Sequence, residues 1–272
     1  MTGDLVLSKE CQRLANISRL TMLDMAEICR ETMHWGGSLS SMEIFAVLYK
    51  AVLRENDIFI LSKGHAGPGY YAVLYNVGKI SHEILMTYQQ NGSDLAELVE
   101  SNSKLGFVSS GGSLGINLSY ASGIALLVKK TGVDKQVYIE VGDGEIDEGS
   151  VWESIMFASQ QKLDNLTMII DFNHLQSDGN TKNIIGWDNL KNQLTSFGWV
   201  VHTVNGHECL DIMNALLAEN KENRPKAIIA TTIKGKGISF MEDDNSWHDR
   251  KLRKKELQLA RKEVRILVGN GE

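Results

Sequence analysis

Two apolar stretches of this chain are each followed by a residue whose side-chain oxygen could bind a metal ion. The run 137–141 leads into Gly142-Asp143-Gly144, and the run 167–171 leads into Asn173. Mg²⁺ takes oxygen ligands and usually binds through one or two carboxylates together with the phosphates of a ligand. The glycines beside Asp143 carry no Cβ, so a phosphorylated molecule could approach the backbone closely. The pattern predicts a site for Mg²⁺ and a diphosphate, with Asp143, Asn173 and the backbone carbonyl of Leu175 as ligands.

Three histidines lie in settings that suit proton transfer beside such a site. His34 precedes Trp35-Gly36-Gly37, His65 lies in Ser62-Lys63-Gly64-His65, and His248 follows Trp247. A lone histidine in a loop is usually structural or solvated. Three of them next to glycine-rich or aromatic loops form a candidate polar funnel, because histidine exchanges protons near neutral pH and donates to anionic oxygens.

Three further carboxylates, Glu145, Asp147 and Glu148, follow the metal candidate directly. All three together would overload a Mg²⁺–diphosphate site with negative charge. At least two are therefore expected to point elsewhere, towards a partner or a helix N-terminus.

Composition limits the class of protein. The chain has 272 residues, of which 43% are hydrophobic and 23% charged, as in ordinary soluble enzymes. Three cysteines without CxxC spacing predict reduced thiols in a cytoplasmic protein. No signal segment or long apolar run is present, so no membrane span is expected. Residues 249–272 carry eight Lys/Arg against four Asp/Glu, which indicates a solvated helix or linker, and the acidic remainder argues against nucleic-acid binding.

Helix-like and strand-like segments alternate along the chain. This alternation predicts a single α/β domain, residues 1–272, with a mostly parallel sheet and helices on both faces. In such sheets ligands bind beyond the carboxyl ends of the strands, and Asp143, Asn173 and Lys234 each follow a predicted strand. The predicted strands are 57–62, 137–141, 167–171, 199–204 and 226–232. The predicted helices are about 5–32, 41–53, from 67–69 to 75, 115–129, 150–161, 188–197 and 208–220, with a turn at 36–37 and helix followed by loop over 84–105.

From about Leu14 to His248 the chain resembles the N-terminal, diphosphate-binding half of transketolase, a thiamine-diphosphate enzyme. The motifs are specific in combination. They are His34-Trp35-Gly36-Gly37-Ser38, Asp57 to His65-Ala66-Gly67-Pro68-Gly69, Gly112-Ser113-Leu114-Gly115, Gly142-Asp143-Gly144 to Gly149 and Trp152-Glu153, Lys162-Leu163-Asp164-Asn165, Asp171-Phe172-Asn173 to Asp178-Gly179, and Lys234-Gly235-Lys236-Gly237 to Trp247-His248.

The resemblance implies thiamine diphosphate as cofactor, bridged to the protein by Mg²⁺ on Asp143, Asn173 and the Leu175 carbonyl. His65 and His248 would face the diphosphate and the reacting centre, and His34 would assist proton transfer at the substrate. Glu148 matches a glutamate that, in the family, joins a hydrogen-bond network between the two active sites of the dimer. The remaining residues implied at the cofactor are Gly112, Ser113, Leu114, Gly142, Gly144, Glu145 and Lys234.

Three departures from the family pattern shape the expected function. The chain ends where the pyrimidine-binding domain would begin, so a second subunit carrying the pyrimidine-binding and C-terminal domains is expected, with α₂β₂ as the economical assembly. Residues 101–106 replace a motif whose histidine contacts the donor sugar, and no histidine occurs between 83 and 173. Gly115-Ile116-Asn117 stands where the family has Gly-Gln-Gly.

The predicted activity is therefore transfer of a two-carbon ketol unit to an aldehyde acceptor. The altered donor site leaves an alternative open, decarboxylating acyl transfer from a 2-oxo acid such as pyruvate. A non-catalytic relic of the fold is a third possibility, against which the joint presence of Asp143, Asn173 and the three histidines argues.

Overall fold

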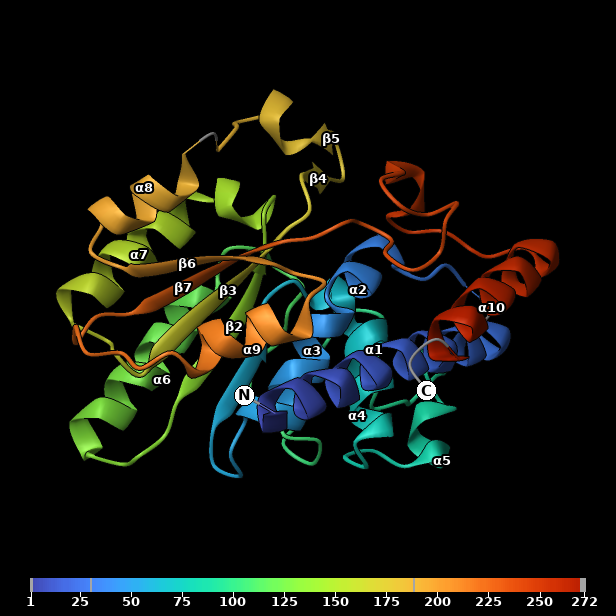
Figure 1. Ribbon diagram of the computed structural model, residues 1–272, viewed down its shortest axis with the longest axis horizontal. Helices are drawn as coiled ribbons and strands as arrows, with labels where there is room; N and C mark the ends of the chain where they lie inside the picture. Colours follow the sequence, from blue (N-terminus) through green and yellow to red (C-terminus); the bar gives the residue numbers. More distant parts are fainter. Residues whose placement is uncertain (1, 30, 188, 270–272) are drawn as a thin grey trace.

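A computed structural model describes residues 2–29, 31–187 and 189–269 of the chain. Its centre is a five-stranded sheet in the order β1-β2-β3-β7-β6, in which every pair of neighbouring strands is parallel (Figure 1). The strands are β1 (Ile58–Leu61), β2 (Val137–Gly142), β3 (Leu166–Phe172), β6 (Val200–Asn205) and β7 (Lys226–Thr231). This arrangement confirms the predicted parallel α/β architecture. Parallel neighbours require crossover connections, which return the chain to the edge of the sheet where each strand begins.

Helices cover both faces of the sheet, and alternate side chains of each strand enter two separate cores. Ile169 of β3 belongs to one core, while its neighbours Met168 and Ile170 belong to the other. The first core includes α1 (Thr2–Ile28), α3 (Met42–Val47), α4 (Gly67–Asn76) and α9 (Cys209–Leu217). The second includes α6 (Asn117–Thr131), α7 (Gly149–Gln160) and α8 (Leu190–Ser196). Burial on two faces explains why the strands have continuous apolar runs.

One local prediction was wrong. The turn expected at Gly36-Gly37 is the start of a short buried helix, α2 (Gly36–Ser40). A Cβ on Gly36 would lie 2.7 Å from side-chain carbons of Lys234, so glycine here permits close packing rather than a chain reversal. The helix predicted over 41–53 is also divided, into α3 and a π-helical turn, η1 (Leu48–Val52).

The loops at the carboxyl edge carry short elements that periodicity does not reveal. A small antiparallel hairpin of β4 (Leu175–Gln176) and β5 (Gly179–Asn180) follows β3 directly. The other short elements are α5 (His82–Leu85), η2 (Gly64–Ala66), η3 (Glu145–Asp147), η4 (Thr181–Asn183) and η5 (Asn245–Trp247).

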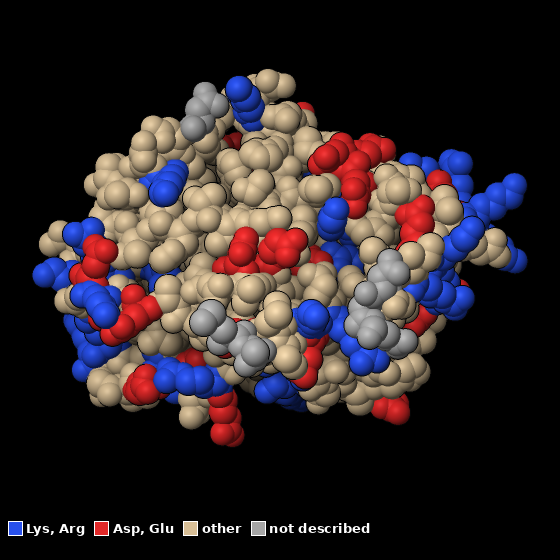
Figure 2. All heavy atoms as spheres, in the orientation of Figure 1, with Lys and Arg blue, Asp and Glu red and all other residues tan. Residues whose placement is uncertain are grey.

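Near its C-terminus the chain forms α10 (Lys254–Gly269), which packs against α1. Arg261 of α10 pairs with Asp24 at 2.6 Å and with Glu27 at 3.0 Å. Lys and Arg side chains gather at this end of the molecule, on the right in Figure 2. Among the described residues, no helix combines the length and apolarity that crossing a membrane requires.

Candidate active site

A cavity of about 260 Å³ lies beyond the carboxyl ends of β2 and β3. It brings together most of the residues that the sequence indicated, although they come from segments up to 183 positions apart in the numbering, from His65 to His248. The predicted residues that line it are His65, Leu114, Gly142, Asp143, Gly144, Glu145, Asn173, Leu175, Lys234 and His248. Glu148 also contributes to its wall.

Asp143 lies at the floor of this cavity and is only 2% exposed. Its Oδ1 accepts a hydrogen bond of 2.9 Å from the Gly144 amide, and its Oδ2 accepts one from the His174 amide. Burial, and next the charge of Asp171, raise the pKa of Asp143 to about 7. Two backbone amides offset the negative charge of this buried carboxylate only in part. A nearby cation would stabilise the charged form further.

The turn after β3 brings two further residues with available oxygen atoms, Asn173 and Leu175, to the same cavity as Asp143. His174 has a φ of +64°, which reverses the chain immediately after Asn173. The amide of Leu175 donates to Oδ1 of Asn173 at 3.0 Å, so this amide oxygen keeps one lone pair for another partner. Because Asp143 also binds the His174 amide, the ends of β2 and β3 are tied together at the point where a metal ion would be held.

A network of buried charges, which the sequence motifs did not reveal, borders the cavity through Lys63 and Asp171. Lys63 Nζ donates to the carboxylate of Asp171, lies 3.3 Å from Glu140 and bonds the Gly37 carbonyl at 3.1 Å. Asp171 also accepts from the hydroxyls of Ser40 and Thr232. The sequence did contain a sign of this network, because charged residues occur inside or beside otherwise apolar strands. Charged residues rarely remain buried unless they are paired.

These contacts set the protonation of the buried groups. Burial would raise the pKa of Asp171, but the charge of Lys63 and the hydrogen bonds from Lys63, Ser40 and Thr232 together outweigh it, so the pKa is lowered. Burial raises the pKa of Glu140 to about 7, because Lys63 and Ser41 offset it only in part and Oε2 of Glu140 has no hydrogen-bond partner among the described residues.

Lys234 and His248 form the opposite wall of the cavity. Lys234 Nζ donates to Asn245 Oδ1 at 2.6 Å and to His248 Nδ1 at 3.0 Å, and reaches the Leu175 carbonyl at 3.5 Å. Burial lowers the pKa of Lys234 to about 8. Burial, together with Lys234, lowers the pKa of His248 to about 4.

The rings of the three candidate histidines lie together, and two of them, His65 and His248, line the cavity. Their ring centroids are 5.7 Å apart for His34 and His65, 5.4 Å for His34 and His248, and 5.4 Å for His65 and His248. Burial, and next the Lys63 charge, hold the pKa of His65 well below its ordinary value. His34 does not line the cavity, but its ring contacts the other two.

The three carboxylates after Gly144 differ in their partners, but only Asp147 lies away from the cavity; Glu145 and Glu148 both line it, so fewer point elsewhere than expected. Glu145 accepts hydrogen bonds from the amides of Gly115 and Gly142, at 2.9 and 3.2 Å, and from the Ser62 hydroxyl. Asp147 accepts from Gln176 and Trp187, and Glu148 is exposed. Glu145 therefore holds the glycine-rich loops of the site in place.

The turn that begins at Gly112 contributes less than expected. Gly112 and Ser113 are exposed and do not line the cavity, whereas Leu114 does. The close approach occurs one residue earlier, where the carbonyl of Gly111 accepts from the Gly64 amide at 2.9 Å.

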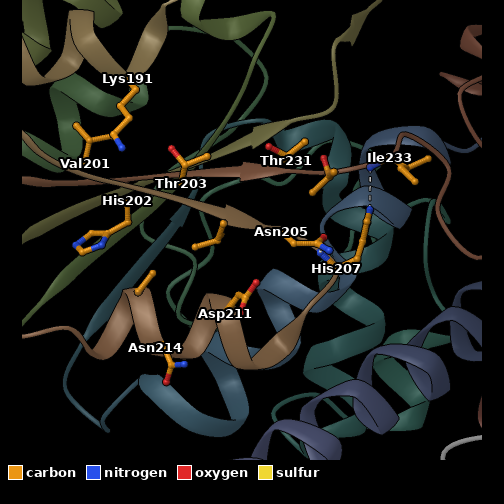
Figure 3. Close-up of a pocket in the computed structure, with 13 residues that line it drawn as sticks. Lys191, Val201, His202, Thr203, Asn205, His207, Asp211, Asn214, Thr231 and Ile233 are labelled. Carbon is orange, nitrogen blue, oxygen red and sulfur yellow. Dashed lines mark hydrogen bonds between the residues drawn. The ribbon is translucent and has the colours of Figure 1, made fainter.

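A larger cavity of about 970 Å³ lies elsewhere, beside β6 and α9 (Figure 3). None of the predicted site residues lines it. His207, which does, accepts the Ile233 amide through Nε2 at 2.8 Å and faces Glu43 through Nδ1 at 3.1 Å, so both ring nitrogens are engaged. We therefore regard the smaller cavity as the candidate active site.

Comparison with known proteins identifies the family of the chain. Residues 10–266 match the family model of the transketolase thiamine diphosphate binding domain. The chain belongs to the transketolase family. The solved transketolase of Campylobacter jejuni superimposes with a TM-score of 0.85 at 26% identity, over 96% of this chain and 45% of that one. This chain thus spans slightly less than half of that transketolase.

Two further relatives match the present chain along most of their own length. One is a subunit of the apulose-4-phosphate transketolase of Actinobacillus succinogenes. It is 38% identical over 241 residues, which cover 85% of this chain and 87% of that protein. The 6-deoxy-6-sulfo-D-fructose transketolase subunit SqwG of a Clostridium species is 36% identical over 254 residues, 89% and 92% of the two chains. These matches support ketol transfer over the decarboxylating alternative.

Proposed function

We propose that the chain is a single diphosphate-binding domain that acts as the thiamine-diphosphate-binding subunit of a two-subunit transketolase, moving a two-carbon ketol unit from a ketose to an aldehyde. The observation that carries this proposal is the meeting of Asp143, Asn173, Leu175 and Lys234 at one cavity beyond the carboxyl ends of the strands. Thiamine diphosphate supplies the nucleophilic carbon and the electron sink for this chemistry.

The residues present suit a Mg²⁺ ion with a diphosphate. Asp143, the side-chain oxygen of Asn173 and the carbonyl of Leu175 offer three hard oxygen donors, and Mg²⁺ usually completes its shell with phosphate oxygens and water. Lys234 offers a buried ammonium to the diphosphate, and its lowered pKa reflects the lack of a fully compensating anion.

The histidines suit the reacting end of the site. His65 and His248 are held in the neutral form by burial and by the neighbouring lysines. A neutral imidazole can donate a hydrogen bond to a sugar oxygen without placing another positive charge beside Lys63 and Lys234. We assign to His34 the exchange of protons with substrate hydroxyls, because its ring adjoins those of His65 and His248, which line the site.

An exposed apolar face beside the cavity supports assembly with a second polypeptide. Ile116, which immediately precedes α6, and Tyr120 and Leu127 of α6 follow helical spacing, and Met156 and Phe157 lie on α7, which contacts α6; these five side chains are between 42% and 63% exposed. Large exposed apolar side chains on two adjoining helices are typical of interfaces. Both relatives are named as transketolase subunits, which agrees with a partner that would carry the pyrimidine-binding domain in an α₂β₂ assembly.

The same proposal includes a cytoplasmic location and a sugar substrate. Cys11, Cys29 and Cys209 are buried free thiols, as a reducing compartment favours. The two relatives are named for apulose 4-phosphate and for 6-deoxy-6-sulfo-D-fructose, so ketoses outside the common sugar phosphates belong in a donor screen.

The test is isothermal calorimetry of thiamine diphosphate with Mg²⁺, carried out on the chain mixed with its candidate partner. Asp143→Asn should abolish the binding heat. Asp147→Asn is the matched control, because the Asp147 carboxylate bonds Trp187 and Gln176 rather than the metal position. Cofactor affinity that survives in Asp143→Asn would refute the metal assignment.

A second assay tests the reaction itself. The reconstituted complex should transfer a ketol unit from at least one ketose to an aldehyde acceptor. Failure with every ketose, together with release of labelled CO₂ from pyruvate, would replace ketol transfer with the decarboxylating alternative.

A further inference from the structure

His34 faces two carboxylates that the sequence motifs do not include. Its Nδ1 lies 2.9 Å from Oε1 of Glu97 and 3.9 Å from Oδ1 of Asp249. The His34 side chain is 15% exposed, whereas Glu97 is 36% exposed and can rotate. Nδ1 has no aligned hydrogen-bond partner among the described residues, so a small rotation of Glu97 would complete a bond that is already at hydrogen-bonding distance.

Backbone contacts hold these side chains in place. Met33 forms an isolated antiparallel bridge with Arg250, and Trp35 Nε1 donates to the Arg250 carbonyl at 2.8 Å. These contacts fix His34 beside Asp249. Glu97 comes from the irregular segment after α5, which is anchored beside His65 because the Val99 amide donates to the Gly64 carbonyl at 3.2 Å.

The neighbours of each ring determine which nitrogen carries the hydrogen. As an ammonium, Lys234 can only donate, so the Nδ1 of His248 that it contacts at 3.0 Å is the bare nitrogen, and the hydrogen of neutral His248 lies on Nε2. That Nε2 lies 3.4 Å from the Ser177 hydroxyl. A carboxylate can only accept, so the Nδ1 of His34 opposite Glu97 must carry its hydrogen. The two histidines therefore have opposite tautomers.

We propose that Glu97 is a positioning residue that holds His34 in the Nδ1–H tautomer and so leaves Nε2 as a bare acceptor for a substrate hydroxyl. His248, with its hydrogen on Nε2, is the complementary donor. A carboxylate that orients an imidazole through one nitrogen and frees the other is a common arrangement at functional histidines. The inference rests on the proposed function, because it gives His34 its role at the substrate, but the tautomer is measurable without turnover.

The direct test is nitrogen-15 NMR of the histidine side chains in the full chain at pH 7.2, where Lys234 is still mostly an ammonium and ordinary histidines are mostly neutral. His34→Asn identifies the His34 signals by their loss. Wild-type His34 should show the Nδ1–H pattern and His248 the Nε2–H pattern. In Glu97→Leu the His34 pattern should move towards Nε2–H. Glu100→Leu is the matched control, because Glu100 is an exposed residue of the same segment, and it should leave His34 unchanged.

Kinetics of the reconstituted complex give a second readout. Glu97→Leu should lower kcat about 10- to 100-fold, the scale of loss when the second partner of a functional histidine is removed, while cofactor affinity stays within twofold. Glu97→Gln should restore part of the rate because its amide oxygen can still accept from Nδ1. A wild-type His34 tautomer in Glu97→Leu, or equal kcat in Glu97→Leu and Glu100→Leu, would overturn the proposal. If the complex transfers no ketol unit at all, the proposed function fails and the NMR result still decides the role of Glu97.

Discussion

Replacing Glu140 by glutamine should stabilise the chain strongly at alkaline pH and only slightly in acid. Glu140 lies in β2 with no exposed surface, and burial raises its pKa to about 7. An acid whose pKa is higher in the folded state binds more protons there than in the unfolded chain. The contribution of Glu140 to the stability of the wild type therefore falls as pH rises from about 4.5 to about 7 and is level above that range.

The size of the effect follows from the pKa difference. A rise from 4.5 to about 7 corresponds to a loss on the order of 3 kcal/mol, of which about 2.5 kcal/mol develops between pH 5 and pH 8. Glutamine cannot ionise, yet its amide oxygen can still accept the hydrogen bond that Ser41 donates to Glu140. Lys63 keeps its partner Asp171.

The assay is thermal unfolding of the chain without cofactor at pH 5 and pH 8. The Tm difference between Glu140→Gln and wild type should widen by roughly 5–10 °C over that interval, taking about 2–4 °C per kcal/mol for a domain of this size. Glu55→Gln, at an exposed turn, provides the comparison and should show no such change. A Tm difference for Glu140→Gln that is the same at both pH values would refute the reasoning, because the buried carboxyl would then ionise at an ordinary pH.

Three other perturbations address the site and its frame. His34→Ala should keep cofactor affinity within twofold by calorimetry and lower kcat about 100-fold, as expected when a proton-transfer group is lost. Lys234→Ala should weaken thiamine diphosphate binding by about 1.5–3 kcal/mol, roughly 10- to 150-fold in Kd, and unchanged affinity would exclude its contact with the diphosphate. Gly64→Ala should cost about 1–3 kcal/mol of stability in denaturant unfolding, because its Cβ would lie 2.5 Å from the Gly111 carbonyl, whereas Gly123→Ala on α6 meets nothing within 4 Å and should be neutral or stabilising.

The carboxyl edge was the predictable part of the molecule. Parallel strands end on one edge, so residues that follow apolar runs must approach one another even when they are far apart in the chain. This reasoning placed Asp143, Asn173 and Lys234 around one cavity. Element boundaries were predicted to within a few residues, as for β2 and β3, because apolar runs define strands well.

Contacts made by irregular backbone were not predictable. The approach of Glu97 to His34 depends on a loop without periodicity and on the bridge between Met33 and Arg250, which joins positions more than 200 residues apart. Gly112 and Ser113 are exposed because the residue packed against Gly64 is Gly111, one position before the expected Gly112. No local rule of sequence determines such offsets, because tertiary packing selects them.

The electrostatics of the cavity explain why metal and diphosphate should bind as a pair. Burial raises the pKa of Asp143 and lowers that of Lys234, so each charged form lacks a sufficient counter-charge inside the folded chain. A cation alone would satisfy Asp143 but repel Lys234 and Lys63. A diphosphate alone would satisfy Lys234 but repel Asp143 and Asp171. A Mg²⁺–diphosphate pair would present positive charge to Asp143 and negative charge to Lys234, and it is therefore the ligand that we propose for this arrangement of buried charges.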